Sequence, residues 1–230
     1  MDFTKKLGQF QPKKTLDPRE LYESLDRASD KGPLRPAQDY ILKTWHENRR
    51  NERDLIVKLQ TGQGKTLIGL LMLQARLNES VGPVVYLCAN NFLADQTTQQ
   101  ANEFGIKNIC TDPDDTEFIA GRSILINNVT KLFNGRSRFG LGPDSHKVGA
   151  LLLDDSHACA DSIRSTFSIS LKSNHSLYGA LRDLFETELE YQGMGSFADI
   201  KLGKFDSLLP VPYWAWRDRL NEDEMDREGC

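Results

Sequence analysis

The segment Leu59-Gln60-Thr61-Gly62-Gln63-Gly64-Lys65-Thr66 is the most informative stretch of this 230-residue chain. It follows a short apolar run with strand character (residues 55–59) and precedes a longer apolar stretch with helical character (residues 66–77). A glycine-rich turn between a strand and a helix is the setting that a phosphate-binding loop requires. We therefore expect these eight residues to contact a nucleotide.

Four residues of this loop each serve a chemical need. Gly62 and Gly64 allow backbone torsions that other residues avoid, so that successive amides can turn toward one anion. The helix that follows adds free N–H groups and the positive end of its dipole. We expect Lys65 to contact the β- and γ-phosphates as a catalytic residue, and the Thr66 hydroxyl to bind Mg²⁺. The alternative is a glycine turn whose lysine is merely solvated.

The loop departs from the general pattern at one position. That pattern has a glycine five residues before Gly64, where this chain has Leu59. A small-molecule kinase of the P-loop class would need that glycine, so Leu59 argues against a kinase. The shorter loop, with Thr61-Gly62, is the form found in the DEAD/DEAH-box helicase superfamily. The chain resembles that superfamily, which implies ATP as the nucleotide and Mg²⁺ as its cation.

Further apolar runs predict the fold class. They lie at residues 84–88, 124–126 and 149–153. Short runs that are apolar on both faces and alternate with helices indicate a parallel sheet covered on both sides. Helices are expected to begin at Pro18 and Pro36, with Asp17 as an N-cap, and to span residues 91–104. The fold is therefore α/β, and the resemblance implies a RecA-like P-loop NTPase domain.

Two acids follow the last of these strands, in Leu151-Leu152-Leu153-Asp154-Asp155-Ser156-His157. A buried strand that ends in carboxylates places them at the edge of the sheet where α/β folds bind ligands. By resemblance, Asp154 binds Mg²⁺, Asp155 is the catalytic acid that orients or deprotonates the attacking water, and His157 couples the nucleotide to the nucleic-acid side. The family usually has glutamate where this chain has Asp155. The alternatives are two solvated loop acids and a histidine near a helix start.

An upstream pentapeptide, Leu34-Arg35-Pro36-Ala37-Gln38, resembles the family segment whose glutamine recognises adenine. A side-chain amide can pair with the N6 and N7 positions of adenine. Gln38 is accordingly expected to bind the nucleotide base. The alternative is an exposed glutamine on an amphipathic helix.

Two weaker motifs point to nucleic acid, DNA or RNA, as a partner. The segment from Ala89 to Gln96 and the one from Asn127 to Phe133 each follow a strand and resemble motifs that touch a nucleic-acid backbone. Amide and hydroxyl side chains can bind phosphate oxygens. The expected contacts are Asn90, Asn91, Gln96 and Thr130. For both segments, ordinary helix N-caps are the competing interpretation.

Composition sets the broad class. The chain is 39% hydrophobic and 27% charged, with a net charge of −4, which excludes a disordered chain and a histone-like binder. The four cysteines, Cys88, Cys110, Cys159 and Cys230, lie far apart, so we expect reduced thiols and no metal cluster. No signal peptide or membrane segment is visible. We expect a cytoplasmic protein, or a nuclear one in a eukaryote, that is not secreted.

The predicted organisation has three parts. Residues 1–33 form a leader and a helix, residues 34–165 the helicase-like ATP-binding lobe, and residues 166–230 an insertion or the start of a further helicase region. The last part is expected to be helical but partly irregular, and its expected features are a helix over 177–191, a glycine-rich loop over 193–203, an aromatic patch at 212–216 and a frayed acidic end at 221–230.

Two features of a complete helicase are missing from the sequence. There is no Ser-Ala-Thr motif after the acidic strand, and too few residues follow Ala160 to form a second RecA-like lobe with its arginines. We expect an ATP-binding lobe of a helicase or translocase whose hydrolysis depends on such a lobe, supplied in trans or in a full-length chain. The alternative is a non-catalytic module that uses nucleotide to bind nucleic acid or a protein.

Overall fold

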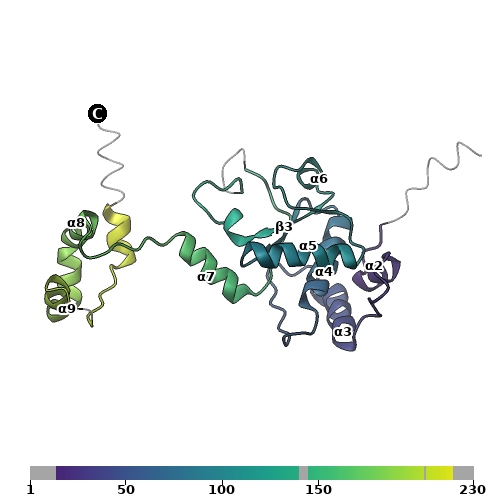
Figure 1. Ribbon diagram of the computed structural model, residues 1–230, viewed down its shortest axis with the longest axis horizontal. Helices are drawn as coiled ribbons and strands as arrows, with labels where there is room; N and C mark the ends of the chain where they lie inside the picture. Colours follow the sequence, from purple (N-terminus) through teal and green to yellow (C-terminus); the bar gives the residue numbers. More distant parts are fainter. Residues whose placement is uncertain (1–13, 140–144, 205, 220–230) are drawn as a thin grey trace, which may run out of the picture. The chain divides into compact units, whose positions relative to one another are not determined.

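The computed structural model describes residues 14–139, 145–204 and 206–219 (Figure 1). The chain forms two compact units, Met1–Ser168 and Ile169–Cys230, which are considered separately here. Residues 1–13 of the leader and the acidic stretch 221–230, with Cys230, lie outside the described residues. No described helix combines the length and the apolar character that crossing a bilayer takes.

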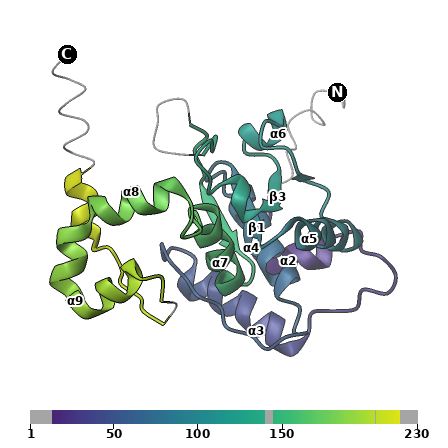
Figure 2. The ribbon, with the colours of Figure 1, turned by 60° about the vertical axis from the view of Figure 1, so that its left-hand side comes forward.

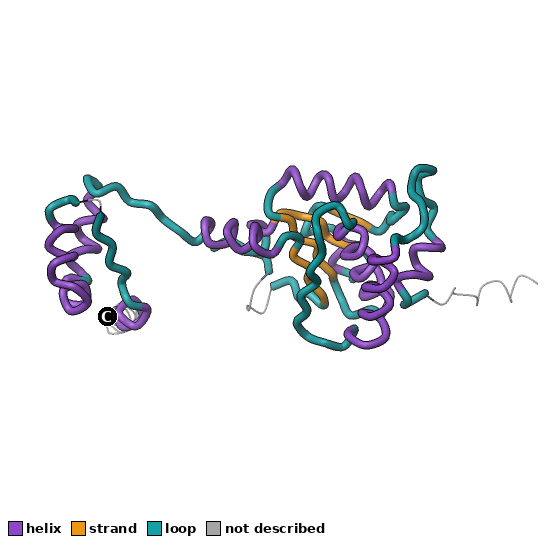
Figure 3. The backbone as a smooth tube through the Cα atoms, turned by 90° about the horizontal axis from the view of Figure 1, so that it is seen from below, coloured by secondary structure: helices purple, strands orange, loops and turns teal. Residues whose placement is uncertain are grey.

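A parallel sheet forms the centre of the first unit (Figure 3). Its strands are β1 (Val84–Cys88), β2 (Ile109–Cys110), β3 (Ile124–Asn128) and β4 (Ala150–Leu153). They pair in the order β2-β3-β1-β4, and every pairing is parallel. The predicted α/β class with a parallel sheet is therefore confirmed. The two interior strands, β1 and β3, are buried on both faces, as their continuous apolar runs require.

Helices cover both faces of the sheet. Helices α4 (Lys65–Asn78) and α5 (Asn91–Glu103) pack on the face that carries Val84, Tyr86 and Cys88. The opposite face, with Val85 and Leu87, is covered by α6 (Thr116–Ile119), the 3₁₀ turn η2 (Val129–Lys131) and α7 (Ser156–Thr166). Helix α4 is buried along almost its whole length, so the element that begins at Lys65 is anchored in the core.

A third layer covers the outer side of α4. It contains α2 (Pro18–Ser24) and α3 (Pro36–Thr44), both labelled in Figure 2, and the π-helical turn η1 (Trp45–Arg49). Their apolar side chains pack on α4. Asp17 caps α2 as expected, since its carboxylate accepts a hydrogen bond from Arg19 N at 2.9 Å. This layer brings the start of α3, and with it Gln38, close to the loop before α4.

The strand expected over residues 55–59 does not form. This segment is non-helical and largely exposed, and the side chain of Ile56 is 92% exposed. A strand needs a neighbour to pair with, and within the described residues β4 forms the edge of the sheet and pairs with β1 alone. Along β4, Leu151 and Leu153 are exposed, so this edge of the sheet is covered on one face only.

The second unit is a small helical assembly with its own core. Helices α8 (Ser176–Leu184) and α9 (Glu186–Lys201) meet at Phe185, so the helix expected over 177–191 forms, but as two helices that break at that residue. The expected glycine loop over 193–203 is wrong up to Lys201, because α9 continues through it with a kink at Gly193. The buried residues that hold this unit together are Phe185, Leu189, Phe197 and Ala215.

The aromatic patch divides between the core and the surface of this unit. The Trp216 ring lies 4.5 Å from that of Phe185, measured between centroids. Tyr213 and Trp214 are exposed. Trp216 therefore packs on the core of this unit but is itself 42% exposed, so all three aromatic residues reach solvent.

Gly149, which leads into β4, should tolerate no side chain. A Cβ built there would lie 2.2 Å from the carbonyl oxygen of Val81, in a stretch held by the hydrogen bond from Gly149 N to Pro83 O at 2.7 Å. Gly149→Ala should lower the free energy of unfolding by about 1–3 kcal/mol, because backbone must move to make room. Chemical denaturation measures this, with Gly135→Ala as the control, since no atom lies within 4 Å of a Cβ at that position. Equal stability of the two variants would contradict the argument.

Candidate functional site

The loop before α4 has the backbone shape that its glycines suggest. Gly62 has φ +82° and Gly64 has φ +76°, both in the left-handed region that glycine adopts most easily. Between them, Gln63 N donates to Gln60 O at 3.4 Å and closes the turn. Leu59 packs its side chain on the apolar cluster around α4, and thereby anchors the start of the loop.

The N-terminus of α4 is chemically open. Gly64 is its N-cap and offers no side chain to the first amides, and the first turn carries no acidic residue. Lys65 is exposed and Thr66 half-buried at this end. Free N–H groups and an uncompensated dipole favour an anion here, and a lysine in the same turn adds a positive charge.

Gln38 and Arg35 hold the loop from the side of α3. Gln38 donates from Nε2 to Gln63 O at 3.2 Å and accepts at Oε1 from Arg35 N at 2.9 Å. Arg35 Nη1 donates to Gly62 O at 2.7 Å. Gln38 is 5% exposed, so the alternative of a solvated glutamine is wrong. Its amide keeps one donor and one acceptor for a further ligand.

Thr66 and Asp154, expected to share a cation, converge on Tyr86. Asp154 N donates to Leu87 O at 2.8 Å, which extends the pairing of β4 with β1 up to the acid. The Tyr86 side chain is fully buried, and burial raises its pKa well above the usual value. The nearby Asp154 carboxylate raises this pKa further, whereas the Thr66 hydroxyl lowers it. Both residues therefore lie next to the same phenol.

The residues present fit a magnesium ion that is shared with a nucleotide. Within the described residues, no group of three or more His, Cys, Asp or Glu side chains could hold a metal by itself. Mg²⁺ is commonly bound by one or two protein oxygens together with phosphate oxygens and water. Thr66 and Asp154 would supply those protein oxygens.

Asp155 has a structural role in this chain. It is the N-cap of α7, with φ +51°, and its carboxylate accepts a hydrogen bond from Ala158 N at 3.3 Å. Aspartate is among the few residues that both cap helices well and tolerate the left-handed region. This accounts for aspartate at a position where the helicase superfamily usually has glutamate. His157 lies exposed in the first turn of α7.

Three of the four residues proposed to contact nucleic acid lie where β1 and β3 end. Asn90 caps α5, accepting from Leu93 N at 3.0 Å, so the N-cap interpretation holds for it. Asn91 Oδ1 accepts a hydrogen bond from Asn128 Nδ2, and Thr130 Oγ1 donates to Asn128 Oδ1 at 2.6 Å. The register pairs Cys88 with Asn128, which explains why the two segments meet. Gln96 is exposed on α5 and takes no part in these bonds.

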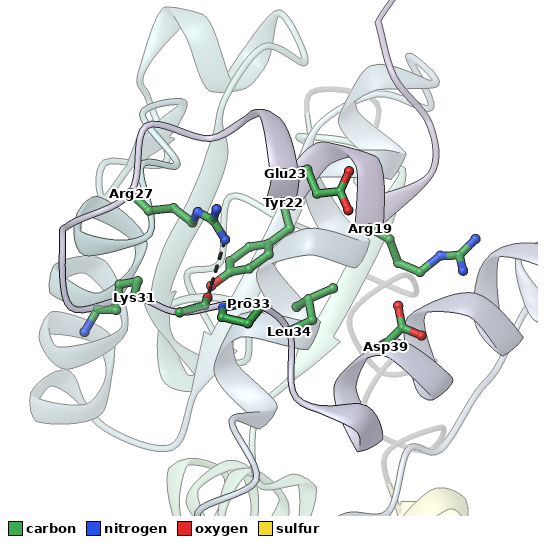
Figure 4. A pocket seen from close by; sticks show the side chains of 9 residues that line it. Arg19, Tyr22, Glu23, Arg27, Lys31, Pro33, Leu34 and Asp39 are labelled. Carbon is green, nitrogen blue, oxygen red and sulfur yellow. Dashed lines mark hydrogen bonds between the residues drawn. The ribbon is translucent and has the colours of Figure 1, made fainter.

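A cavity of about 400 Å³ lies beside the start of α3 (Figure 4). Its lining residues are Arg19, Tyr22, Glu23, Arg27, Lys31, Gly32, Pro33, Leu34 and Asp39. The Arg27 guanidinium lies 4.2 Å above the Tyr22 ring, whose hydroxyl donates to Gly32 O at 2.7 Å. The lining of the cavity therefore includes an aromatic ring and charges of both signs. Several of the lining residues are close to Gln38 in the sequence.

The three cysteines in the described part of the chain have no role in this chemistry. Burial raises the pKa of the Cys88 and Cys159 thiols to about 11, and that of Cys110 to about 12. Such thiols stay protonated and unreactive near neutral pH. Cys159 instead donates to the Asp154 carbonyl oxygen at 3.1 Å and helps fix the end of β4.

Two residues at the site were not expected from the sequence. Tyr86 reads as one more apolar residue of a buried strand, and nothing in the pattern shows where its hydroxyl lies. Asn128 is hydrogen-bonded to both Asn91 and Thr130. It is the last residue of a strand, and a polar residue at a strand end could have indicated that it belongs to the site.

The glycine loop, the open end of α4 and the acid after β4 define an α/β domain of the P-loop nucleotide-binding class. A family model described as type III restriction enzyme, res subunit, matches residues 31–179. The match covers more than half of the chain, so this protein belongs to that family, whose domain is the N-terminal RecA-like domain of superfamily two helicases. The resemblance to a first RecA-like lobe is thereby confirmed. No curated protein matches the chain. No solved structure matches it either.

Proposed function

We propose that this chain binds ATP with Mg²⁺ and is the ATP-binding lobe of a DEAD/DEAH-like helicase or translocase that acts on nucleic acid. The observation that carries the proposal is the open N-terminus of α4 behind a left-handed Gly64, with Lys65 and Thr66 in its first turn and Asp154 at the end of β4. Family membership supports a helicase-like ATP-binding lobe, and this geometry supports ATP–Mg²⁺ as its ligand.

Each residue has a definite part in the proposal. Lys65 and the first amides of α4 bind the β- and γ-phosphates, and Gln38 offers its remaining donor and acceptor to the adenine. Thr66 and Asp154 supply oxygens to Mg²⁺, which when bound neutralises charge on the phosphates. Asp155 orients or deprotonates the attacking water.

The strand ends carry the proposed contact with nucleic acid. The Asn91 side chain uses its oxygen to accept from Asn128, and phosphate oxygens accept hydrogen bonds from amide N–H groups such as the one it keeps. The Thr130 hydroxyl would have to release Asn128 Oδ1 before it could donate to a phosphate oxygen. Part of the hydrogen-bonding capacity of Asn90 is already used, because its side-chain oxygen caps α5. His157, exposed at the start of α7, is the proposed link between this surface and the nucleotide.

Efficient hydrolysis is proposed to need a second RecA-like lobe, in trans or in a full-length chain. Arginines that stabilise charge on the transferred phosphoryl group contribute about 10³–10⁵ in rate in related enzymes. Without them we expect slow turnover and no unwinding of a duplex.

One observation favours a second candidate, a non-catalytic module that uses ATP to control binding. The carboxylate of Asp155, the proposed catalytic acid, is engaged with Ala158 N as the cap of α7. An acid retained only for capping would leave binding intact and hydrolysis absent.

Calorimetric titration of the chain with ATP, with Mg²⁺ and then with EDTA, tests the proposal. We expect binding that is tighter with Mg²⁺, slow hydrolysis, and little change in that rate when single-stranded DNA or RNA is added alone. Titration to millimolar ATP without heat would refute nucleotide binding. Fast turnover stimulated by nucleic acid would refute the need for a second lobe.

A further inference from the structure

Tyr86 occupies the centre of the sheet. It lies in the middle of β1, paired with Ile126 on β3 and with Leu152 on β4, and its side chain is fully buried. Its ring belongs to the cluster beneath α4. A tyrosine in such a place buries a polar group where phenylalanine would fill the same volume.

The ring lies directly under the first turns of α4. A Cβ built on Gly69 would lie 3.0 Å from Tyr86 Cε2 and 2.8 Å from Leu152 Cδ1, so the missing side chain at Gly69 lets α4 rest on the ring. Gly69 follows Thr66 by three residues, which places both on one face of the helix. The phenol therefore extends from Gly69 toward the turn that carries Thr66.

The hydroxyl at the end of this ring is buried with it. Among the described residues, no group meets the buried Tyr86 oxygen in hydrogen-bond geometry, although Asp154 and Thr66 are close enough to influence its pKa. Buried hydroxyls are almost always hydrogen-bonded, and one that is not destabilises the fold. The fold thus keeps an unsatisfied donor beside the two proposed magnesium ligands.

We propose that Tyr86 is a positioning residue of the nucleotide site: its hydroxyl accepts from Thr66 and donates to the Asp154 carboxylate once the site is filled. A phenol can do both at once. The inference rests on the proposed function. The geometry agrees with it: Asp154 follows Leu152, the cross-strand partner of Tyr86, by two residues, and Thr66 shares a helix face with Gly69, which rests on the ring.

Tyr86→Phe tests the inference, with Tyr22→Phe as the matched control. Tyr22 is also buried, but its hydroxyl already donates to Gly32 O. For Tyr86→Phe we expect the affinity for Mg²⁺ in the presence of ATP to fall about 10-fold, as for other groups that orient metal ligands, with ATP affinity in EDTA unchanged. The melting temperature without ligands should stay equal or rise by about 2 °C, because an unpartnered hydroxyl is removed.

The control should show the reverse. Tyr22→Phe should lower the melting temperature by about 2–4 °C and leave the ratio of ATP affinities with and without Mg²⁺ as in the parent chain. An unchanged ratio for Tyr86→Phe, whatever its melting temperature, would overturn the inference while the proposed function stands. A parent chain whose ATP binding ignores Mg²⁺ would overturn both.

Discussion

Lys65→Ala should lower the affinity of the chain for ATP about 100-fold, the upper end of what a hydrogen bond to a charged group contributes. The lysine stands in the first turn of α4, where the helix dipole disfavours a cation. When a polyphosphate is bound, its negative charge makes the positive charge of Lys65 favourable at this position. Calorimetric titration with ATP measures the loss, and thermal melting without ligand should give an equal or slightly higher midpoint.

Lys43→Ala is the matched control for this change. Lys43 is exposed in the last turn of α3, where the dipole favours a cation. Its removal should slightly lower stability and leave ATP affinity unchanged. If the two variants bind ATP equally well, the loop before α4 is not a phosphate site.

Local hydrophobic patterns were sufficient to predict the two strands in the interior of the sheet. The runs that form β1 and β3 are apolar at successive positions and lie inside the sheet. Residues 55–59 have the same character and form no strand, because strand formation depends on a partner elsewhere in the chain. Sequence indicates that a segment suits a strand, and it does not indicate whether a neighbour is there to pair with it.

The second unit shows the opposite error. Glycines at 193 and 195 predict a loop, since each costs about 1 kcal/mol within a helix. Burial of Leu189 and Phe197 on either side of them outweighs that cost, and α9 continues with a kink. The sequence pattern of a single segment does not show tertiary packing of this kind.

At the candidate site, the motifs located the loop and the acids but not the contacts between them. The pentapeptide that ends at Gln38 suggested that this residue binds the nucleotide base, and the structure adds its hydrogen bond to Gln63 O. The proposed link between Thr66 and Asp154 passes through Tyr86, which lies on β1 beside β4 and belongs to no motif. Such a link follows from the strand order β1 beside β4, which is a property of the whole sheet.

Asp155→Asn should separate the two roles of this acid. Asparagine caps helices as well as aspartate does and tolerates the left-handed region equally, so α7 should keep its cap. The loss of charge at the helix N-terminus should cost no more than about 1 kcal/mol. Asparagine cannot accept a proton from water, however, and hydrolysis should fall about 10²–10⁴-fold. Single-turnover assays, with protein in excess over ATP, make this slow reaction measurable.

Asp155→Glu is the informative counterpart, because it keeps the carboxylate and weakens the cap. We expect it to lower the free energy of unfolding by about 0.5–2 kcal/mol, since glutamate is a poor N-cap and disfavours a positive φ. Hydrolysis should survive in this variant and be lost in Asp155→Asn, with ATP–Mg²⁺ affinity similar in both. Should Asp155→Asn hydrolyse ATP as fast as the parent chain, the carboxylate serves α7 alone, and the non-catalytic module becomes the better description of this lobe.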